Sequence, residues 1–103
     1  LGPSGKNIYP EEIEAKLNNL QYIAESIVVD RDSKLVALVY PDYETADKMN
    51  IEENEMKKIM ENNRIKLNKI LPEYMKIVKV EISSREFEKT PKKSIKRYLY
   101  TRQ

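Results

Sequence analysis

The sequence contains no cysteine and no histidine, and it has only two glycines among its 103 residues. Without cysteine there is no disulfide and no thiol nucleophile, and without either residue the usual zinc ligand sets are missing. The absence of histidine also removes the commonest general base at neutral pH. No apolar run approaches the ~20 residues that span a bilayer, and no signal-peptide pattern opens the chain. These absences favour a soluble, intracellular protein.

Charge of one sign is also scarce overall, because the formal net charge is only +2. The positive charge collects at one end: residues 85–103 carry a local net charge of +5, which leaves −3 on residues 1–84. With 40% hydrophobic and 35% charged residues, the composition is that of one globular domain with a modest core. A solvated tail is the simplest interpretation of the basic end, and a contact with nucleic acid phosphates is the rival.

The first half of the sequence predicts a loop, a helix and a hairpin. The stretch LGPSGKN at 1–7 holds both glycines and favours a loop, and a start without methionine suggests a domain cut from a longer protein. Pro10 suits a first helical turn, and Ile13, Leu17 and Leu20 follow at helical spacing, so we expect a helix over about residues 10–19. Two β-branched and aliphatic runs separated by RDS predict a hairpin around residues 25–40.

The second half predicts a loop, a long helix, a last strand and a short terminal helix. The stretch 41–50 favours a connecting loop, and Asn50 with Glu53 has the spacing of a capping box. Ile65 should be partly exposed beside the apolar stripe of the long helix, which comprises Met56, Ile59, Met60, Asn63, Leu67, Ile70 and Leu71 and ends before Pro72. A strand is expected to pack through Ile77, Val78, Val80 and Ile82, and a helix to form over 93–100.

The predicted fold class is therefore α+β: a small three-stranded sheet, made of a hairpin and one further strand, packed with about three helices. A single domain over residues 1–103 accounts for all of these elements.

No group of residues in this sequence makes an enzyme when taken alone. The acids of EEIE at 11–14 are expected on a solvated helix face, and the methionine-containing stripe in the core. The stretch SGKN at 4–7 lacks the glycine that precedes Lys-Ser/Thr in a phosphate-binding P-loop. Against nucleic-acid binding, the rest of the surface is acidic and the order of elements fits no common nucleic-acid fold.

Two segments at opposite ends of the chain resemble one family. The first matches a G-x-N-I-x-P-x-E-I-E segment through Gly5, Asn7, Ile8, Pro10, Glu12, Ile13 and Glu14. The second carries an LP-x-Y turn and matches a closing K-T-P-x-G-K-I-x-R motif through Lys89, Thr90, Pro91, Ile95 and Arg97. Together they resemble the C-terminal domain of adenylate-forming enzymes, nearest to the AMP-forming acyl-CoA synthetases, and the likeness covers essentially the whole chain.

The resemblance implies part of a two-step ligase that is inactive as an isolated domain. A large N-terminal domain outside this sequence would bind ATP, Mg²⁺ and a fatty acid, form an acyl-adenylate and release pyrophosphate. The C-terminal domain would be a mobile lid that presents one face for adenylation and another for thioester formation with CoA. We expect no metal site in the lid itself.

The closing motif departs from the family pattern at its key position. In the family a lysine directly precedes the isoleucine, and its ammonium would offset charge on the attacking carboxylate and the α-phosphate. Here Ser94 precedes Ile95, and Lys93 takes the glycine position. Three interpretations stay open: a loop slipped by one residue so that Lys93 enters the cleft, a degenerate site with slow adenylation at Ser94, or Lys96 reaching around. Lys93 and Ser94 are thus the candidate catalytic positions.

The other matched residues divide into channel residues and structural residues. By resemblance, the residues along the channel for the pantetheine arm of CoA are Gly5, Lys6, Asn7 and Ile8. Pro10 and Glu12 are expected to begin the first helix and Arg97 to anchor the terminal helix, with Lys89 and Thr90 supporting the motif. The residues expected to pack rather than to stack on a ligand are Tyr98 and Tyr100.

Two rival functions stay open beside the leading hypothesis. The domain could be the lid of another adenylating enzyme, such as an amino-acid-activating domain that loads a carrier protein. It could also be a small module whose basic end binds RNA or an anionic membrane surface, which salt would weaken steeply. The leading hypothesis is a cytoplasmic fatty acid–CoA ligase, partnered by its own N-terminal domain and a fatty acid and not by nucleic acid, with peripheral membrane association of the parent left open.

Overall fold

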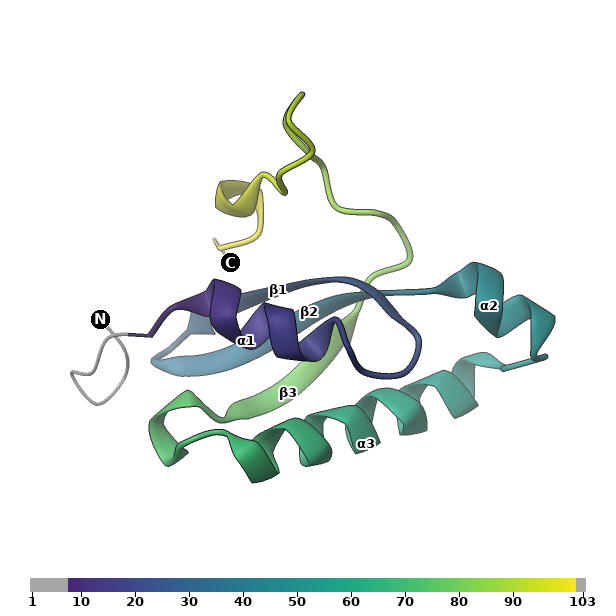
Figure 1. Ribbon diagram of the computed structural model, residues 1–103, viewed down its shortest axis with the longest axis horizontal. Helices are drawn as coiled ribbons and strands as arrows, with labels where there is room; N and C mark the ends of the chain where they lie inside the picture. Colours follow the sequence, from purple (N-terminus) through teal and green to yellow (C-terminus); the bar gives the residue numbers. More distant parts are fainter. Residues whose placement is uncertain (1–7, 102–103) are drawn as a thin grey trace.

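The computed structural model describes residues 8–101 as a small sheet that carries helices on one face. Its helices and strands are α1 (Pro10–Leu17), β1 (Ile23–Arg31), β2 (Lys34–Pro41), α2 (Tyr43–Lys48), α3 (Glu53–Ile70) and β3 (Ile77–Ile82), with single 3-10 turns at Glu73–Met75 and Arg97–Leu99. Figure 1 shows the C-terminal segment (residues 83–101) leaving the end of β3 and returning toward the start of α1. The predicted α+β class with its three-stranded sheet is confirmed.

β1 and β2 form the predicted hairpin through a two-residue turn. Arg31 pairs with Lys34, and the φ angles of Asp32 and Ser33 between them are 53° and 63°. Two central residues with positive φ make a type I′ turn, whose twist matches that of the flanking strands. Aspartate enters this region more readily than most residues, so the turn forms without glycine.

β3 pairs with β2 in parallel, so the strand order is β1-β2-β3 and α3 is the crossover between the parallel neighbours. Side chains of α3 form hydrogen bonds with the backbone at the start of β3, on the edge of the sheet that faces away from β2. The amide of Asn68 accepts from the backbone N–H of Ile77 (2.9 Å) and donates to its carbonyl (2.8 Å), and Arg64 donates to the same carbonyl (3.0 Å). This end of β3 is therefore fixed to the helix that precedes it.

A register shift at the start of β3 turns one predicted packing residue outward. Leu35 pairs with Ile77 and Val36 with Lys79, so Val78 is the extra residue and its side chain is 49% exposed. The prediction that Val78 packs in the core is wrong, because the shift takes it out of the alternation of the strand.

The larger hydrophobic core lies between one face of the sheet and the two longer helices. Its buried members are Ile13, Leu17, Ile23, Val28, Leu35, Ala37, Val39, Ala46, Met56, Met60, Leu67, Leu71 and Ile77. Most of the predicted stripe along α3 is buried, but Ile59 is only half-buried and lies outside this cluster, and Leu71 rather than Ile70 takes the last core position. Ile70 is 67% exposed because one residue of helix rotates the side chain by about 100°. Ile65 is partly exposed, as predicted.

The C-terminal segment covers the opposite face of the sheet. Phe87 is buried there in a second apolar cluster with Ile27, Val29, Val36 and Leu38, against which Tyr40, Ile95 and Tyr100 pack. Strands buried on both faces have continuous apolar runs, and the runs in β1 and β2 have this character. The predicted terminal helix is wrong: backbone hydrogen bonds between 88 and 96 form a hairpin, and only a 3-10 turn at Arg97–Leu99 follows it.

The stretch predicted as a loop at 41–50 contains α2. The carboxylate of Asp42 begins this helix, because it accepts from the backbone N–H of Thr45 (3.2 Å) and from its hydroxyl (2.7 Å). The side-chain and backbone hydrogen bonds from Thr45 lower the pKa of Asp42 below its usual range. The Asp-x-x-Thr spacing at 42–45 is thus a signal for the start of a helix. The prediction of a loop over 41–50 is wrong, because α2 lies within it.

Asn50 ends α2, so the prediction that it begins α3 is wrong. Its φ is 56°, its N–H donates to the carbonyl of Asp47 (3.2 Å), and the next N–H, of Ile51, donates to Ala46 (2.9 Å). This pair of hydrogen bonds around a left-handed residue is the Schellman motif that commonly closes helices. α3 starts later without a side-chain cap.

Asn63 is a polar side chain within the apolar stripe, and it is 1% exposed. Its amide donates to the carbonyl of Gln21 at 2.9 Å and lies 3.6 Å from the sulfur of Met60. The hydrogen bond joins α3 to the turn before β1, so this position needs an amide and not an aliphatic side chain.

We predict that Asn63→Leu destabilises the domain by about 2 kcal/mol, although leucine is more hydrophobic, because the carbonyl of Gln21 loses its buried donor. Urea unfolding followed by circular dichroism measures the change. Asn62→Leu is the control, since Asn62 is exposed on the same helix and should change the free energy of unfolding by less than about 0.5 kcal/mol. Equal stability of the two variants would contradict the role assigned to Asn63.

Arg31 and Glu81 join the two outer strands over the face that carries Phe87. Their side chains form an ion pair at 2.7 Å, and Lys79 adds a second cation 3.1 Å from the same carboxylate oxygen. The hydrogen bond from Arg31 is the main reason that the pKa of Glu81 lies below its ordinary value of 4.5. A lowered pKa in the folded state means that the stabilisation is present above the ordinary pKa and is lost as the pH falls through the lowered one.

We therefore predict that Glu81→Gln lowers stability at pH 7 by up to about 1 kcal/mol, and that this difference from the wild type shrinks as the pH is lowered below 4.5. Urea midpoints at a series of pH values between 3 and 7 measure it. A difference that stays constant across this series would mean that the charge of Glu81 contributes nothing.

Candidate functional site

The predicted catalytic positions, Lys93 and Ser94, lie in an exposed hairpin, the C-terminal hairpin (residues 89–95). Lys89 and Ile95 form an antiparallel bridge, and the N–H of Thr90 donates to the carbonyl of Ser94 at 2.8 Å. Pro91, Lys92, Lys93 and Ser94 are exposed. The tip therefore stands out from the domain on two paired stems.

The turn of this hairpin places Lys93 in a conformation that glycine favours. The N–H of Lys93 donates to the carbonyl of Thr90 (2.8 Å), closing a four-residue turn with Pro91 in its second place. Lys92 has negative φ, which makes the turn type I, and Lys93 follows at φ 66°. A type I turn followed by one left-handed residue is a common three-residue hairpin connection, in which the left-handed place is usually glycine.

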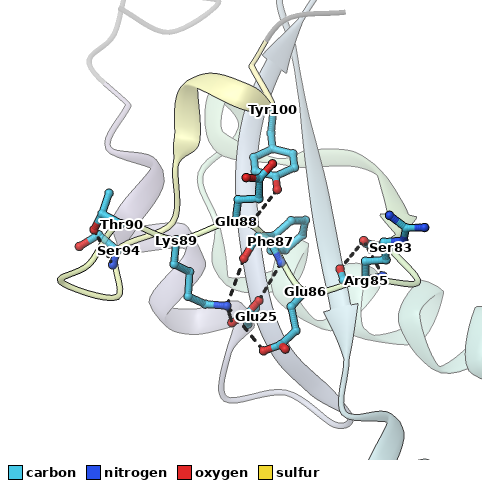
Figure 2. Close-up of polar contacts among 10 residues, drawn as sticks. All are labelled: Glu25, Ser83, Arg85, Glu86, Phe87, Glu88, Lys89, Thr90, Ser94 and Tyr100. Carbon is cyan, nitrogen blue, oxygen red and sulfur yellow. Dashed lines mark hydrogen bonds and ion pairs between the residues drawn. The ribbon is translucent and has the colours of Figure 1, made fainter.

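Ser94 lies beside Thr90 at the start of the returning stem. Its N–H donates to the hydroxyl of Thr90 at 3.3 Å. Figure 2 shows the two side chains together at the tip, away from the carboxylate of Glu25. The predicted catalytic pair, Lys93 and Ser94, is thus brought to one exposed turn, with the hydroxyl of Ser94 free of the ion pairs at the base.

The first stem is held by an ion pair between Lys89 and Glu25 of β1. The ammonium of Lys89 also donates to the carbonyl of Phe87 (3.2 Å), and the second oxygen of Glu25 accepts from the N–H of Phe87 (3.2 Å). The hydrogen bond to Glu25 raises the pKa of Lys89, so this lysine stays charged at neutral pH and is unsuited to act as a base. Figure 2 shows these groups converging below the hairpin.

A bulge in β1 explains why Glu25 faces the hairpin. The register shifts between Ile23, which pairs with Pro41, and Glu25, which pairs with Tyr40. Ile23 belongs to the helix-covered core while Ile27 belongs to the opposite cluster, although regular alternation would put them on one face. The extra residue moves Glu25 to the face covered by the C-terminal segment.

An aromatic pair closes the base of the hairpin. The rings of Phe87 and Tyr100 meet edge to face with centroids 5.0 Å apart, and the hydroxyl of Tyr100 accepts from the N–H of Glu88 at 2.8 Å. Tyr100 therefore packs as predicted, whereas Tyr98 is 66% exposed and does not.

The second stem is held by Arg97 and Glu14. The guanidinium donates through two nitrogens to the two carboxylate oxygens of Glu14, and one of these oxygens also accepts from the N–H of Val28 at 2.7 Å. Glu14 is buried, and its hydrogen bond is the main reason that the pKa of Arg97 is raised. The motif arginine thus anchors the C-terminal segment, although to α1 and β1 and without the terminal helix that had been expected.

The residues predicted along a CoA channel are only partly described. Gly5, Lys6 and Asn7 lie outside the described residues. Ile8 is half-buried and packs against the larger core. Pro10 is the first residue of α1 and Glu12 is exposed in its first turn, which agrees with their expected part in starting the helix.

A groove between α2, the start of α3 and the end of β3 offers a volume of about 830 Å³. Its polar lining includes Asp47, Glu52 and Glu53 against a single cation, Lys57. This charge is wrong for the polyanions ATP and CoA. Within residues 8–101, no three acidic side chains come together as a metal site, and no helix has the length and apolar content to cross a bilayer.

Sequence reasoning missed the partners of the motif residues. Lys89 and Arg97 were recognised from the motif, but Glu25 depends on a bulge that leaves no sequence signal. Glu14 was matched only as a motif letter, and the EEIE stretch was expected to be solvated. The apolar neighbour of the charged tail, Phe87, was the one available hint that this segment packs on the sheet.

The fold is that of the C-terminal domain of adenylate-forming enzymes. It combines a three-stranded sheet, two longer helices on one face and a basic hairpin formed by the closing motif. The model of the family "AMP-binding enzyme C-terminal domain" matches residues 3–103, and the chain belongs to this family. The family predicted from the two motifs is confirmed. No curated protein sequence matches the chain.

Solved structures of CoA ligases share the fold. A benzoate CoA ligase from Burkholderia xenovorans LB400 superposes with a TM-score of 0.72 at 20% identity, over 95% of this chain and 19% of that one. For an acyl-CoA synthetase from Brucella canis the TM-score is 0.69 at 24% identity, over 93% and 17%. For a fatty acyl CoA synthetase from Mycobacterium tuberculosis it is 0.56 at 20% identity, over 94% and 18%. The chain thus spans about a fifth of the proteins it resembles.

We predict that Lys93→Gly raises the free energy of unfolding by about 1 kcal/mol, because glycine adopts positive φ without the steric cost that a Cβ imposes. Urea unfolding measures the gain. The control is Lys92→Gly, one residue earlier at negative φ, which should lose stability through added backbone entropy in the unfolded chain. A loss of stability in both variants would show that position 93 carries no left-handed strain.

Proposed function

We propose that this domain is the mobile lid of an AMP-forming fatty acid–CoA ligase, which converts a fatty acid, ATP and CoA to acyl-CoA, AMP and pyrophosphate. The observation that carries the proposal is the C-terminal hairpin: an exposed basic tip on anchored stems, formed by the closing motif of the family. The choice of a fatty acid rests on the resemblance of the two motifs, since the fold is shared with a benzoate CoA ligase as well as with a fatty acyl CoA synthetase. The proposal places the enzyme in the cytoplasm, where ATP and CoA are available.

In this proposal the tip contributes a positive charge to a site whose walls belong to the N-terminal domain. When a carboxylate attacks the α-phosphorus of ATP, negative charge builds on the phosphoryl oxygens while pyrophosphate leaves. An ammonium held close in a water-poor cleft stabilises that charge. Mg²⁺ and the acyl chain would be held by the N-terminal domain, and the segment 5–8 would line the route of the pantetheine arm in the second half-reaction.

Lys93 is the group we assign to this task. The bridge from Lys89 to Ile95 and the positive φ of Lys93 support an unslipped register, with Ser94 in the place of the family's lysine. A serine hydroxyl carries no charge, and Lys93 is the adjacent exposed ammonium. A lysine kept in a backbone conformation that costs it about 1 kcal/mol is the kind of outlier from which a functional role is inferred.

The test uses the full-length protein that contains this chain and separates the half-reactions. Lys93→Ala should slow fatty-acid-dependent pyrophosphate exchange by about 10²–10³-fold and leave thioester formation from a preformed acyl-adenylate unchanged. Lys92→Ala is the matched control and should lose less than about threefold, because its side chain is one residue further from position 94.

The opposite outcome is equally specific. If Lys93→Ala leaves exchange unchanged while Ser94→Lys accelerates it, the charge belongs at position 94 and the native site is degenerate. A panel of fatty, aromatic and amino acids in the same assay distinguishes a fatty acid–CoA ligase from the lid of another adenylating enzyme.

A further inference from the structure

We infer that Glu14 and Glu25 are positioning residues for the adenylation half-reaction, because they fix the two stems of the C-terminal hairpin to β1 and thereby set where its tip stands. This inference rests on the proposed function, since it assigns these residues to one of the two steps of the lid. Neither carboxylate touches the tip itself.

The two contacts lie on opposite stems and meet the same strand. Glu25 belongs to β1 and pairs with Lys89, directly before the tip. Glu14 accepts from the N–H of Val28 in the middle of β1 and pairs with Arg97, directly after the hairpin. The hairpin is therefore attached at both of its ends: directly to β1 through Glu25, and through Glu14 to α1, which the N–H of Val28 joins to the same strand.

Each carboxylate also satisfies backbone that would otherwise be unpaired. Glu25 receives the N–H of Phe87 (3.2 Å), where the C-terminal segment first meets the sheet. Glu14 receives the N–H of Val28 (2.7 Å), which belongs to the edge strand. The side chains are partly shielded, with 18% of Glu25 and 10% of Glu14 exposed, so solvent screens these pairs less than surface pairs.

The rest of the attachment is apolar: Phe87 enters the sheet face, and Ile95 and Tyr100 pack against the same cluster. Apolar contact holds the segment on the sheet but is non-directional. The two ion pairs, with their directed hydrogen bonds, define the orientation of the stems, so the tip keeps a constant position relative to the sheet.

Lys89 and Arg97 already have ion-pair partners within the domain. This supports a positioning role for these pairs rather than a role in binding substrate. Lys89 has Glu25, the carbonyl of Phe87 and, at 3.7 Å, Glu86 around its ammonium. Both oxygens of Glu14 are engaged by Arg97. These two motif cations are therefore neutralised within the domain, whereas Lys92 and Lys93 at the tip are exposed.

The experiment measures both half-reactions in the full-length protein with Glu25→Gln, which keeps the acceptor for the N–H of Phe87 but removes the charge. Pyrophosphate exchange should fall by about 10–100-fold, because a displacement of about 1 Å can cost ~10² in rate. Thioester formation from preformed acyl-adenylate should stay within about twofold. Lys89→Arg, which keeps the ion pair, should retain most of the exchange activity.

The matched control is Glu61→Gln, which removes a glutamate ion-paired with Arg64 on α3 and should leave both half-reactions unchanged. Amide hydrogen exchange provides a readout of position that needs no activity: the N–H of Lys96, bonded to the carbonyl of Glu88 at 2.7 Å, should exchange faster in Glu25→Gln. If Glu25→Gln fails to fold, Lys89→Met breaks the same pair while keeping the hydrogen bond that the N–H of Phe87 donates to Glu25.

The inference is overturned if Glu25→Gln, or Lys89→Met in its place, leaves pyrophosphate exchange within about twofold, or slows both half-reactions equally. Unchanged amide exchange at Lys96 would overturn it as well. Failure of the proposed function has a different signature: the wild-type protein would then show no exchange with any carboxylic acid, while amide exchange would still report whether the glutamates hold the hairpin.

Discussion

The carboxylate of Glu14 is the contact on which the arrangement of this domain depends. It lies 83 residues from Arg97 in sequence, yet it receives two hydrogen bonds from that arginine and one from the backbone of β1. A carboxylate on a side chain that is only 10% exposed needs a counterion, since an unpaired buried charge is costly. The C-terminal segment is therefore needed to neutralise a buried carboxylate. The basic stretch that was most simply interpreted as a solvated tail is part of the folded domain.

This requirement divides the C-terminal segment into anchored and free parts. Phe87, Lys89, Arg97 and Tyr100 face the domain, while Pro91 to Ser94 face outward. The basic charge is divided in the same way, because the anchored cations are matched by glutamates and the outer ones are not. A surface of this kind suits a site completed by a second body: the position of the charge is fixed by one domain, and the anionic groups it meets would be supplied through the other.

The sequence predicted the elements whose signals are local. Apolar periodicity located α1, the hairpin of β1 and β2, and the stripe of α3, and the two motifs identified the family. It failed where the deciding contact is distant or where two local signals compete. Asn50 fits a helix start by spacing, but its backbone closes α2 in the left-handed region. The bulge in β1 that turns Glu25 toward the C-terminal hairpin forms only through pairing with β2. The predicted terminal helix does not form, because residues 88–96 form a hairpin and the segment packs on the sheet.

The way in which the sheet edges are occupied has a consequence for self-association. An open sheet invites another strand wherever unpaired backbone groups are exposed, and such additions lead to aggregation. In this domain Glu14 occupies the N–H of Val28 on one outer strand, and Asn68 and Arg64 occupy both backbone groups of Ile77 on the other. The same carboxylate that fixes the C-terminal segment therefore also blocks one of the positions at which a strand from another molecule could pair with the sheet.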